Sequence, residues 1–81
     1  MREYIVTISI TRDHREEAFV LTVLAPNPGA AKNEALDFCP PGLSVRARDM
    51  EGKVFCITDR GEVVTPRILS WERSDTFSLI Q

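Results

Sequence analysis

Two segments near the start of the chain have the polarity pattern of β-strands. In residues 4–11 apolar and polar side chains alternate and many are β-branched, which is typical of a half-buried strand. Residues 18–25 are apolar on both faces, which is typical of a central strand or of one covered on both sides. The charged segment 12–17 joins the two, and this short connection predicts an antiparallel hairpin.

One helix is expected after the second strand. Asn27 is a favourable N-cap and Pro28 suits the first helical position, so the pattern predicts a helix over residues 29–39. Pro40 and Pro41 end this helix, because proline has no N–H to continue the hydrogen-bond ladder. The apolar stripe that we expect to pack on the sheet consists of Ala31, Ala35, Phe38 and Cys39.

The second half of the chain has the pattern of an antiparallel meander. Its predicted strands, which contain apolar positions bounded by turn residues, are 43–48, 53–58 and 62–65. Turns are expected at 51–52 and 59–61, with Gly61 in a positive-φ bulge position. The segments 67–71 and 76–80 are interpreted as one or two edge strands.

The element order is therefore β-β-α-β-β-β, which predicts an α+β fold in two layers, with one helix on one face of an antiparallel sheet. A helix of about eleven residues is ~16 Å long, whereas five strands span roughly 24 Å, so the helix cannot cover the sheet. The two-sided apolar character of residues 18–25 favours use of the far face by a partner or by a second copy of the chain.

Composition narrows the classes of function. A chain of 81 residues is long enough for one domain only, so we expect residues 1–81 to form a single domain. A net charge of −2 argues against a broad cationic surface, and so against direct nucleic-acid binding. No apolar run approaches the ~20 residues of a membrane helix, and the N-terminus lacks a signal-peptide pattern. We expect a cytoplasmic protein that does not bind membranes.

Few residues offer catalytic chemistry. The single histidine, His14, lies in the charged connection, where a solvated turn residue is favoured over a general base or proton switch. Cys39 and Cys56 are interpreted as buried thiols in a reducing compartment, with a nucleophile or redox pair as the alternative. Without a triad or metal-ligand spacing, we expect no enzymatic activity, no cofactor and no metal.

The best candidate surface is basic. Arg46 and Arg48 alternate outward on the strand predicted over 43–48, with Lys53, Arg60 and Arg67 on neighbouring strands or turns. These arginines and lysine could contact a partner, or could pair with the acidic residues interleaved among them. Trp71 is a further candidate, either as an interface anchor or as a residue that closes the core.

The order of elements resembles that of small phage anti-CRISPR proteins that inhibit type I surveillance complexes. The resemblance covers residues 4–64 and rests on four features of the sequence. They are Tyr4-Ile5 opening a strand, Ala30-Ala31-Lys32 in the helix, Cys39 followed by Gly42, and the glycines Gly52 and Gly61 at turns. It implies a steric inhibitor in the host cytoplasm that docks on the effector complex and blocks nucleic-acid binding without catalysis.

These observations predict a non-enzymatic protein-binding module, with a host CRISPR surveillance complex as the partner that the resemblance implies. The alternative is a small nucleic-acid-binding or regulatory accessory protein that uses a basic sheet face. A homodimer is a further alternative, in which the uncovered sheet face pairs with a second copy.

Overall fold

A β-hairpin from the first part of the chain forms the centre of the sheet. The structure is a computed structural model, whose described residues are 1–12, 14–62 and 67–74. Strands β1 (Arg2–Arg12) and β2 (Arg15–Ala25) pair antiparallel over their full lengths. Both are longer than predicted, because the backbone of the expected charged connection continues the strand pairing across the hairpin. The predicted hairpin is confirmed.

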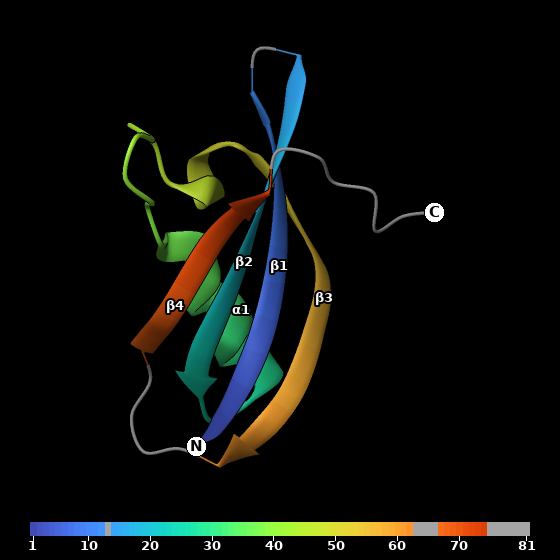
Figure 1. The fold of residues 1–81 in the computed structure, drawn as a ribbon, viewed down its shortest axis with the longest axis vertical. Helices are drawn as coiled ribbons and strands as arrows, with labels where there is room; N and C mark the ends of the chain where they lie inside the picture. Colours follow the sequence, from blue (N-terminus) through green and yellow to red (C-terminus); the bar gives the residue numbers. More distant parts are fainter. Residues whose placement is uncertain (13, 63–66, 75–81) are drawn as a thin grey trace.

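The sheet has four strands in the order β3-β1-β2-β4, and all neighbours are antiparallel (Figure 1). β3 (Glu51–Glu62) and β4 (Arg67–Ser74) flank the hairpin. The central place of β2 confirms what its two apolar faces predict. β4 confirms the edge strand expected from residue 67, whereas the segment 76–80 lies outside the described residues.

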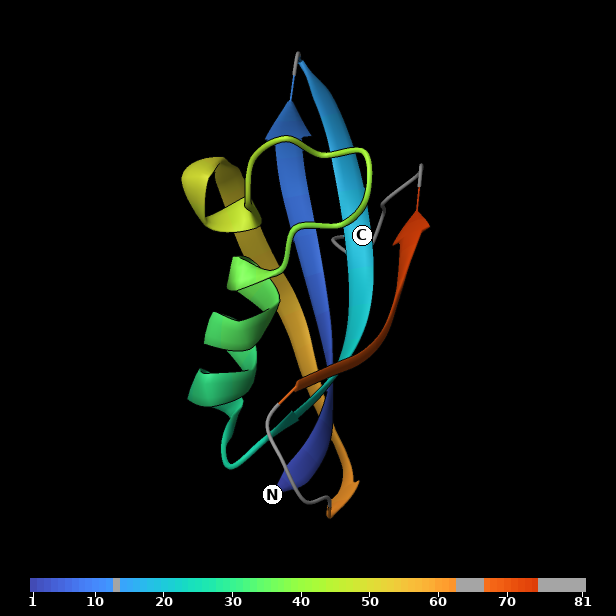
Figure 2. The ribbon, with the colours of Figure 1, turned by 90° about the vertical axis from the view of Figure 1, so that its left-hand side faces the viewer.

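A single helix, α1 (Pro28–Asp37), packs on one face of the sheet, which confirms the two-layer α+β prediction (Figure 2). Asn27 caps it as predicted, because its side-chain oxygen accepts a hydrogen bond from the Ala30 N–H at 2.8 Å. The helix ends two residues earlier than expected, since Pro40 offers no N–H and restricts the residue before it. No described helix is long and apolar enough to cross a membrane.

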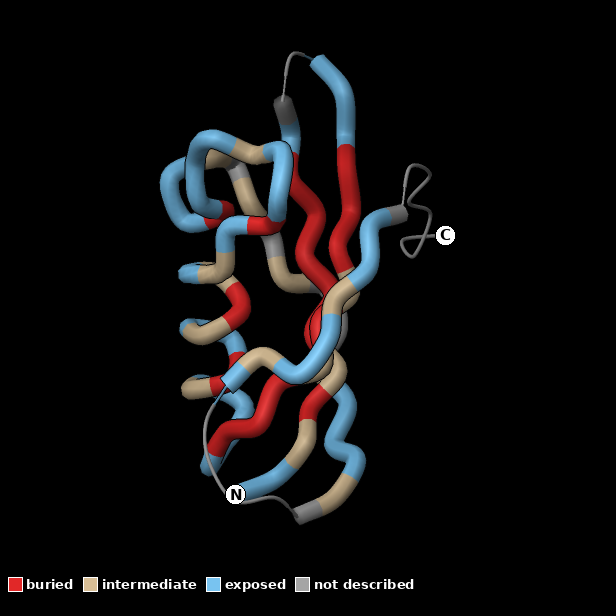
Figure 3. Tube along the Cα trace, turned by 60° about the vertical axis from the view of Figure 1, so that its left-hand side comes forward, coloured by how far each residue is buried: buried red, intermediate tan, exposed pale blue. Residues whose placement is uncertain are grey.

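The core lies between the helix and the hairpin. Figure 3 shows the buried residues concentrated along β1 and β2. The alternating apolar positions that form the core are Tyr4, Val6, Ile8 and Ile10 of β1 and Phe19, Leu21 and Val23 of β2. From the predicted helix stripe, Ala31 and Ala35 are buried and Phe38 is half-buried. Cys39 is exposed, contrary to the prediction, because the helix ends before it.

The strand predicted over 43–48 is wrong. Residues 38–46 form a loop, which the short 3₁₀ helix η1 (Ala47–Asp49) follows. The Leu43 N–H donates to the Pro40 carbonyl oxygen at 3.1 Å, so a turn replaces the expected extended backbone. Only Ala47 of the alternating apolar residues is fully buried.

The turns predicted at 51–52 and 59–61 are also wrong, because β3 runs through both positions. The register with β1 shifts between Glu3 and Tyr4, so that Arg60 has no partner and forms a bulge. Gly61, with φ of 157°, follows this bulge and pairs with Glu3. Most of the strand expected at 62–65 lies outside the described residues. The order of the described elements is thus β-β-α-β-β.

Gly52 lies where η1 approaches β3 closely. A Cβ at this position would stand 2.9 Å from the carbonyl oxygen of Ala47, which is a backbone atom. We therefore expect Gly52→Ala to lower the free energy of unfolding by about 1–3 kcal/mol, as measured by chemical denaturation. An increase in stability, which loss of glycine's backbone entropy would favour, would contradict this close packing.

Candidate functional site

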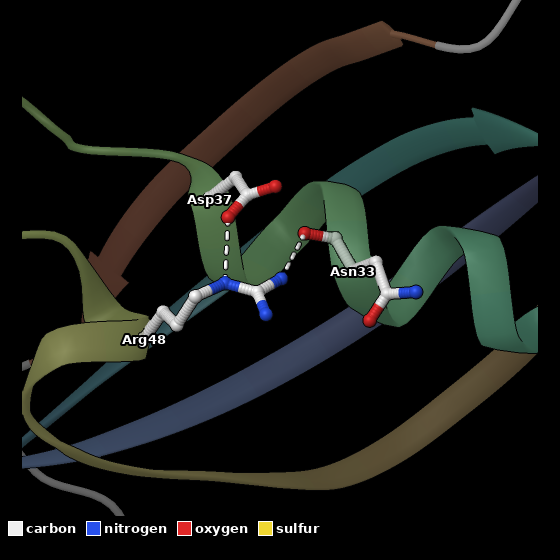
Figure 4. Close-up of polar contacts among 3 residues, drawn as sticks. All are labelled: Asn33, Asp37 and Arg48. Carbon is white, nitrogen blue, oxygen red and sulfur yellow. Dashed lines mark hydrogen bonds and ion pairs between the residues drawn. The ribbon is translucent and has the colours of Figure 1, made fainter.

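The structure places Arg46 and Arg48 on the helix side of the molecule, not on a strand face. Both are exposed, in and just before η1. The Nε of Arg48 donates to Asp37 Oδ1 at 2.7 Å, and its Nη2 donates to the carbonyl oxygen of Asn33 at 3.5 Å (Figure 4). Arg48 therefore links η1 to the end of α1, through an exposed pair that contributes about 0–1 kcal/mol.

The other basic candidates lie on different strands. Arg60, at the bulge of β3, stands 3.8 Å from Glu3 in a loose ion pair. Arg67 is exposed at the start of β4. Lys53 lies in β3 opposite Ser9, and its side chain is outside the described part. Because Arg46 and Arg48 lie at η1 and not on a strand, the candidate arginines as a set do not form one basic sheet face. For Arg48 and Arg60, the structure favours the alternative of pairing with acidic neighbours.

Trp71 covers part of the core on the helix-facing side of the sheet. It is half-buried in β4 and packs against the core, with its ring centroid 5.9 Å from that of Phe19 and 5.7 Å from that of Phe38. The tilted ring pairs connect the edge strand to both the central hairpin and the end of α1. Of the two interpretations of Trp71, core closure is the one that these contacts support.

The face of the sheet that α1 leaves uncovered carries a groove of about 340 Å³. Residues from all four strands line it: Ile5, Val20, Thr22, Arg60, Ser70, Trp71 and Glu72. The register explains their position, because Ile5, Thr22 and Ser70 are cross-strand neighbours that alternate with the core residues. Farther along this face Thr7, Ser9 and Ala18 are buried.

The groove combines three kinds of contact. Ile5 and Val20 provide a half-buried apolar floor, and Thr22 and Ser70 add hydroxyl groups. Arg60 and Glu72 contribute opposite charges. Sequence analysis included Arg60 and Trp71 but missed the remaining lining residues. The apolar positions on the outer face of the hairpin could have indicated these residues. The strand order that brings them together could not be predicted from the sequence.

A buried acidic residue lies near the start of β2, on the helix-facing side of the sheet. Glu17 is only 8% exposed and forms an ion pair with Arg73. The Arg73 guanidinium carbon stands 6.0 Å from the centre of the Phe19 ring. This cluster neutralises a carboxylate at the rim of the core, which is a structural role. Sequence analysis placed Glu17 in the charged connection 12–17 and missed this buried ion pair.

The remaining candidates offer little chemistry. His14 is exposed in the hairpin turn with φ of 62°, which fits the interpretation of a solvated turn residue. Cys39 donates to the carbonyl oxygen of Leu43 at 3.2 Å, and the Cys56 side chain is outside the described part. Within residues 1–12, 14–62 and 67–74, no three metal-binding side chains lie together.

Comparison with protein-family models, curated proteins and solved structures finds no match to this chain.

Proposed function

We propose that this chain is a non-enzymatic protein-binding module that docks its partner on the helix-free face of the sheet. The observation that carries the proposal is the groove of about 340 Å³, which residues from all four strands line. Its mixture of apolar, hydroxyl and charged side chains matches the composition of protein interfaces. A small-molecule site would instead be lined mostly by apolar and aromatic groups. The opposite charges of Arg60 and Glu72 would orient the partner.

The narrower proposal is that the partner is a host CRISPR surveillance complex. It rests on the sequence resemblance to phage anti-CRISPR inhibitors, and it assigns to the chain a steric mechanism that needs no catalysis. A purified type I surveillance complex provides the test. We expect the protein to reduce binding of target DNA in a gel-shift assay. Unchanged DNA binding would contradict this narrower proposal and leave the wider one standing.

The wider proposal is tested by affinity capture from a nuclease-treated host lysate, followed by mass spectrometry. We expect the unmodified chain to retain a defined protein or complex. Thr22→Arg fills the groove, and Arg60→Glu reverses its charge while leaving an exposed position. Each variant is expected to weaken binding of the captured protein by about tenfold or more in a titration. Circular dichroism verifies that both variants fold.

The matched control is Lys32→Glu, because this residue is exposed on α1, in the opposite layer, and changes charge by the same amount as Arg60→Glu. The control is expected to bind like the unmodified chain. Equal binding by all variants would place the docking surface elsewhere. Capture of nucleic acid alone from a parallel lysate that was not treated with nuclease would favour the nucleic-acid-binding alternative.

A further inference from the structure

β4 forms one edge of the sheet. It pairs with β2 on one side, and within the described residues no strand pairs with its other side. Figure 1 shows β4 at the margin of the sheet, and in Figure 2 it passes in front of the other strands, nearest the viewer. The outer N–H and C=O groups of such a strand are a ready template for pairing with another chain.

A bulge in β4 determines which side chains share a face. The register with β2 shifts between Thr22↔Ser70 and Val23↔Ile68, so that Leu69 has no partner. As a result Arg67 and Glu72 lie on the same, helix-free face, although five positions separate them. Ile68 and Trp71 likewise share the helix-facing side. Leu69, at the bulge, is 40% exposed.

We propose that β4 pairs antiparallel with β4 of a second copy of this chain, around a two-fold axis between Leu69 and Ser70. This register brings Arg67 opposite Glu72 of the second copy, twice by symmetry. It also brings Ile68 opposite Trp71 of the second copy, again on matching faces. The interface is the same surface on both copies, as a two-fold dimer requires.

The charges on β4 support a second copy of this chain as the partner of this strand. Arg67 and Glu72 are exposed, and neither makes an ion pair or hydrogen bond with any residue in the described part of the chain. Opposite charges placed directly across an antiparallel pair are stabilising, whereas like charges are destabilising. Charged residues usually protect an edge strand, but here self-pairing makes them complementary.

The same residues disfavour neighbouring registers. An axis through Ser70 would place Arg67, on the helix-free face, opposite Arg73 of the second copy, which lies on the helix-facing side with Phe19. It would also place Ile68, on the helix-facing side, opposite Glu72, on the other face. The faces of β4 therefore exclude this register and favour the one in which residues 67–72 of both copies overlap completely.

The proposal does not depend on the proposed function, because it is tested on the purified chain without any partner. Sedimentation velocity over a wide range of concentration is expected to show a reversible monomer–dimer equilibrium. Arg67→Glu and Glu72→Arg each create two like-charged pairs and are each expected to weaken dimerisation by about tenfold or more. The double variant Arg67→Glu/Glu72→Arg restores complementarity and is expected to recover most of the affinity.

Lys32→Glu serves as the control for a change of charge away from this edge, and circular dichroism verifies folding of each variant. Hydrogen exchange provides a second readout, since amides of residues 67–72 are expected to exchange more slowly at high concentration. A chain that stays monomeric at every concentration overturns the proposal. A dimer that none of the β4 variants weakens, or one without slowed exchange in β4, also overturns it.

Discussion

Replacing Leu21 by alanine is expected to lower the free energy of unfolding by about 3–5 kcal/mol. Leu21 is fully buried in the middle of β2, opposite Val6 of β1 on one side and Trp71 of β4 on the other. Its side chain therefore contacts both neighbouring strands as well as the layer under the helix. Truncation removes apolar contacts and leaves a cavity that the paired strands cannot collapse to fill.

Urea denaturation followed by circular dichroism measures this loss. At about 0.05–0.15 kcal/mol per residue, the whole domain has only a few to roughly a dozen kcal/mol of stability, so the variant is expected to lose a large fraction of it. Val45→Ala is the control, because Val45 is 41% exposed in the loop before η1 and should change stability by less than about 0.5 kcal/mol. A loss below about 1 kcal/mol for Leu21→Ala would contradict the placement of the core.

Replacing Trp71 by alanine is the second large effect, expected at about 2–4 kcal/mol of unfolding free energy. The value lies below that of a fully buried tryptophan, because Trp71 is half-buried. Its ring stands 5.9 Å from Phe19 and 5.7 Å from Phe38, centroid to centroid, so the substitution removes two aromatic contacts at once. Because β4 is held by β2 on one side only, the loss also weakens attachment of the edge strand.

A double-mutant cycle with Phe38→Ala separates the ring contact from the loss of buried area. We expect an interaction energy of about 0.5–1.5 kcal/mol between Trp71 and Phe38. Additive effects of the two substitutions would show that the rings do not stabilise each other. Unchanged stability of Trp71→Ala, together with loss of partner binding, would instead favour the interface interpretation of this residue.

Local patterns were sufficient to predict the central elements. β1 and β2 follow from regular alternation and from the two apolar faces of residues 18–25, and the start of α1 follows from Asn27 and Pro28. In these segments the intrinsic preference, the polarity pattern and the tertiary environment agree. The prediction of one helix on one face of an antiparallel sheet depended only on these elements and on helix length.

The errors occurred where a short pattern had more than one solution. The alternation in 43–48 is too brief to distinguish a strand from a loop that buries only Ala47. The residues Asp59, Arg60 and Gly61 have the composition of a turn. In the structure they continue β3 instead, because β3 pairs with β1 along its length and forms a bulge at this point. Tertiary pairing therefore overrode the local turn preference.

The candidate surface was harder to predict than the fold, because it depends on strand order. Arg46 and Arg48 were assigned to the sheet only through the wrong strand. The groove unites residues as distant in sequence as Ile5 and Glu72, and this becomes visible only when β3 and β4 are known to flank the hairpin. Nothing in the local pattern specifies that the two later strands add to opposite edges.

That strand order has a consequence for synthesis of the protein. A ribosome produces the chain from its N-terminus, so the central hairpin emerges first with both edges unpaired. One edge is covered only when β3 has emerged and the other only when β4 follows. A two-stranded hairpin is marginally stable alone, and its open edges invite association with other chains. The nascent protein therefore passes its most aggregation-prone stage when the helix is complete and the flanking strands are still inside the ribosome.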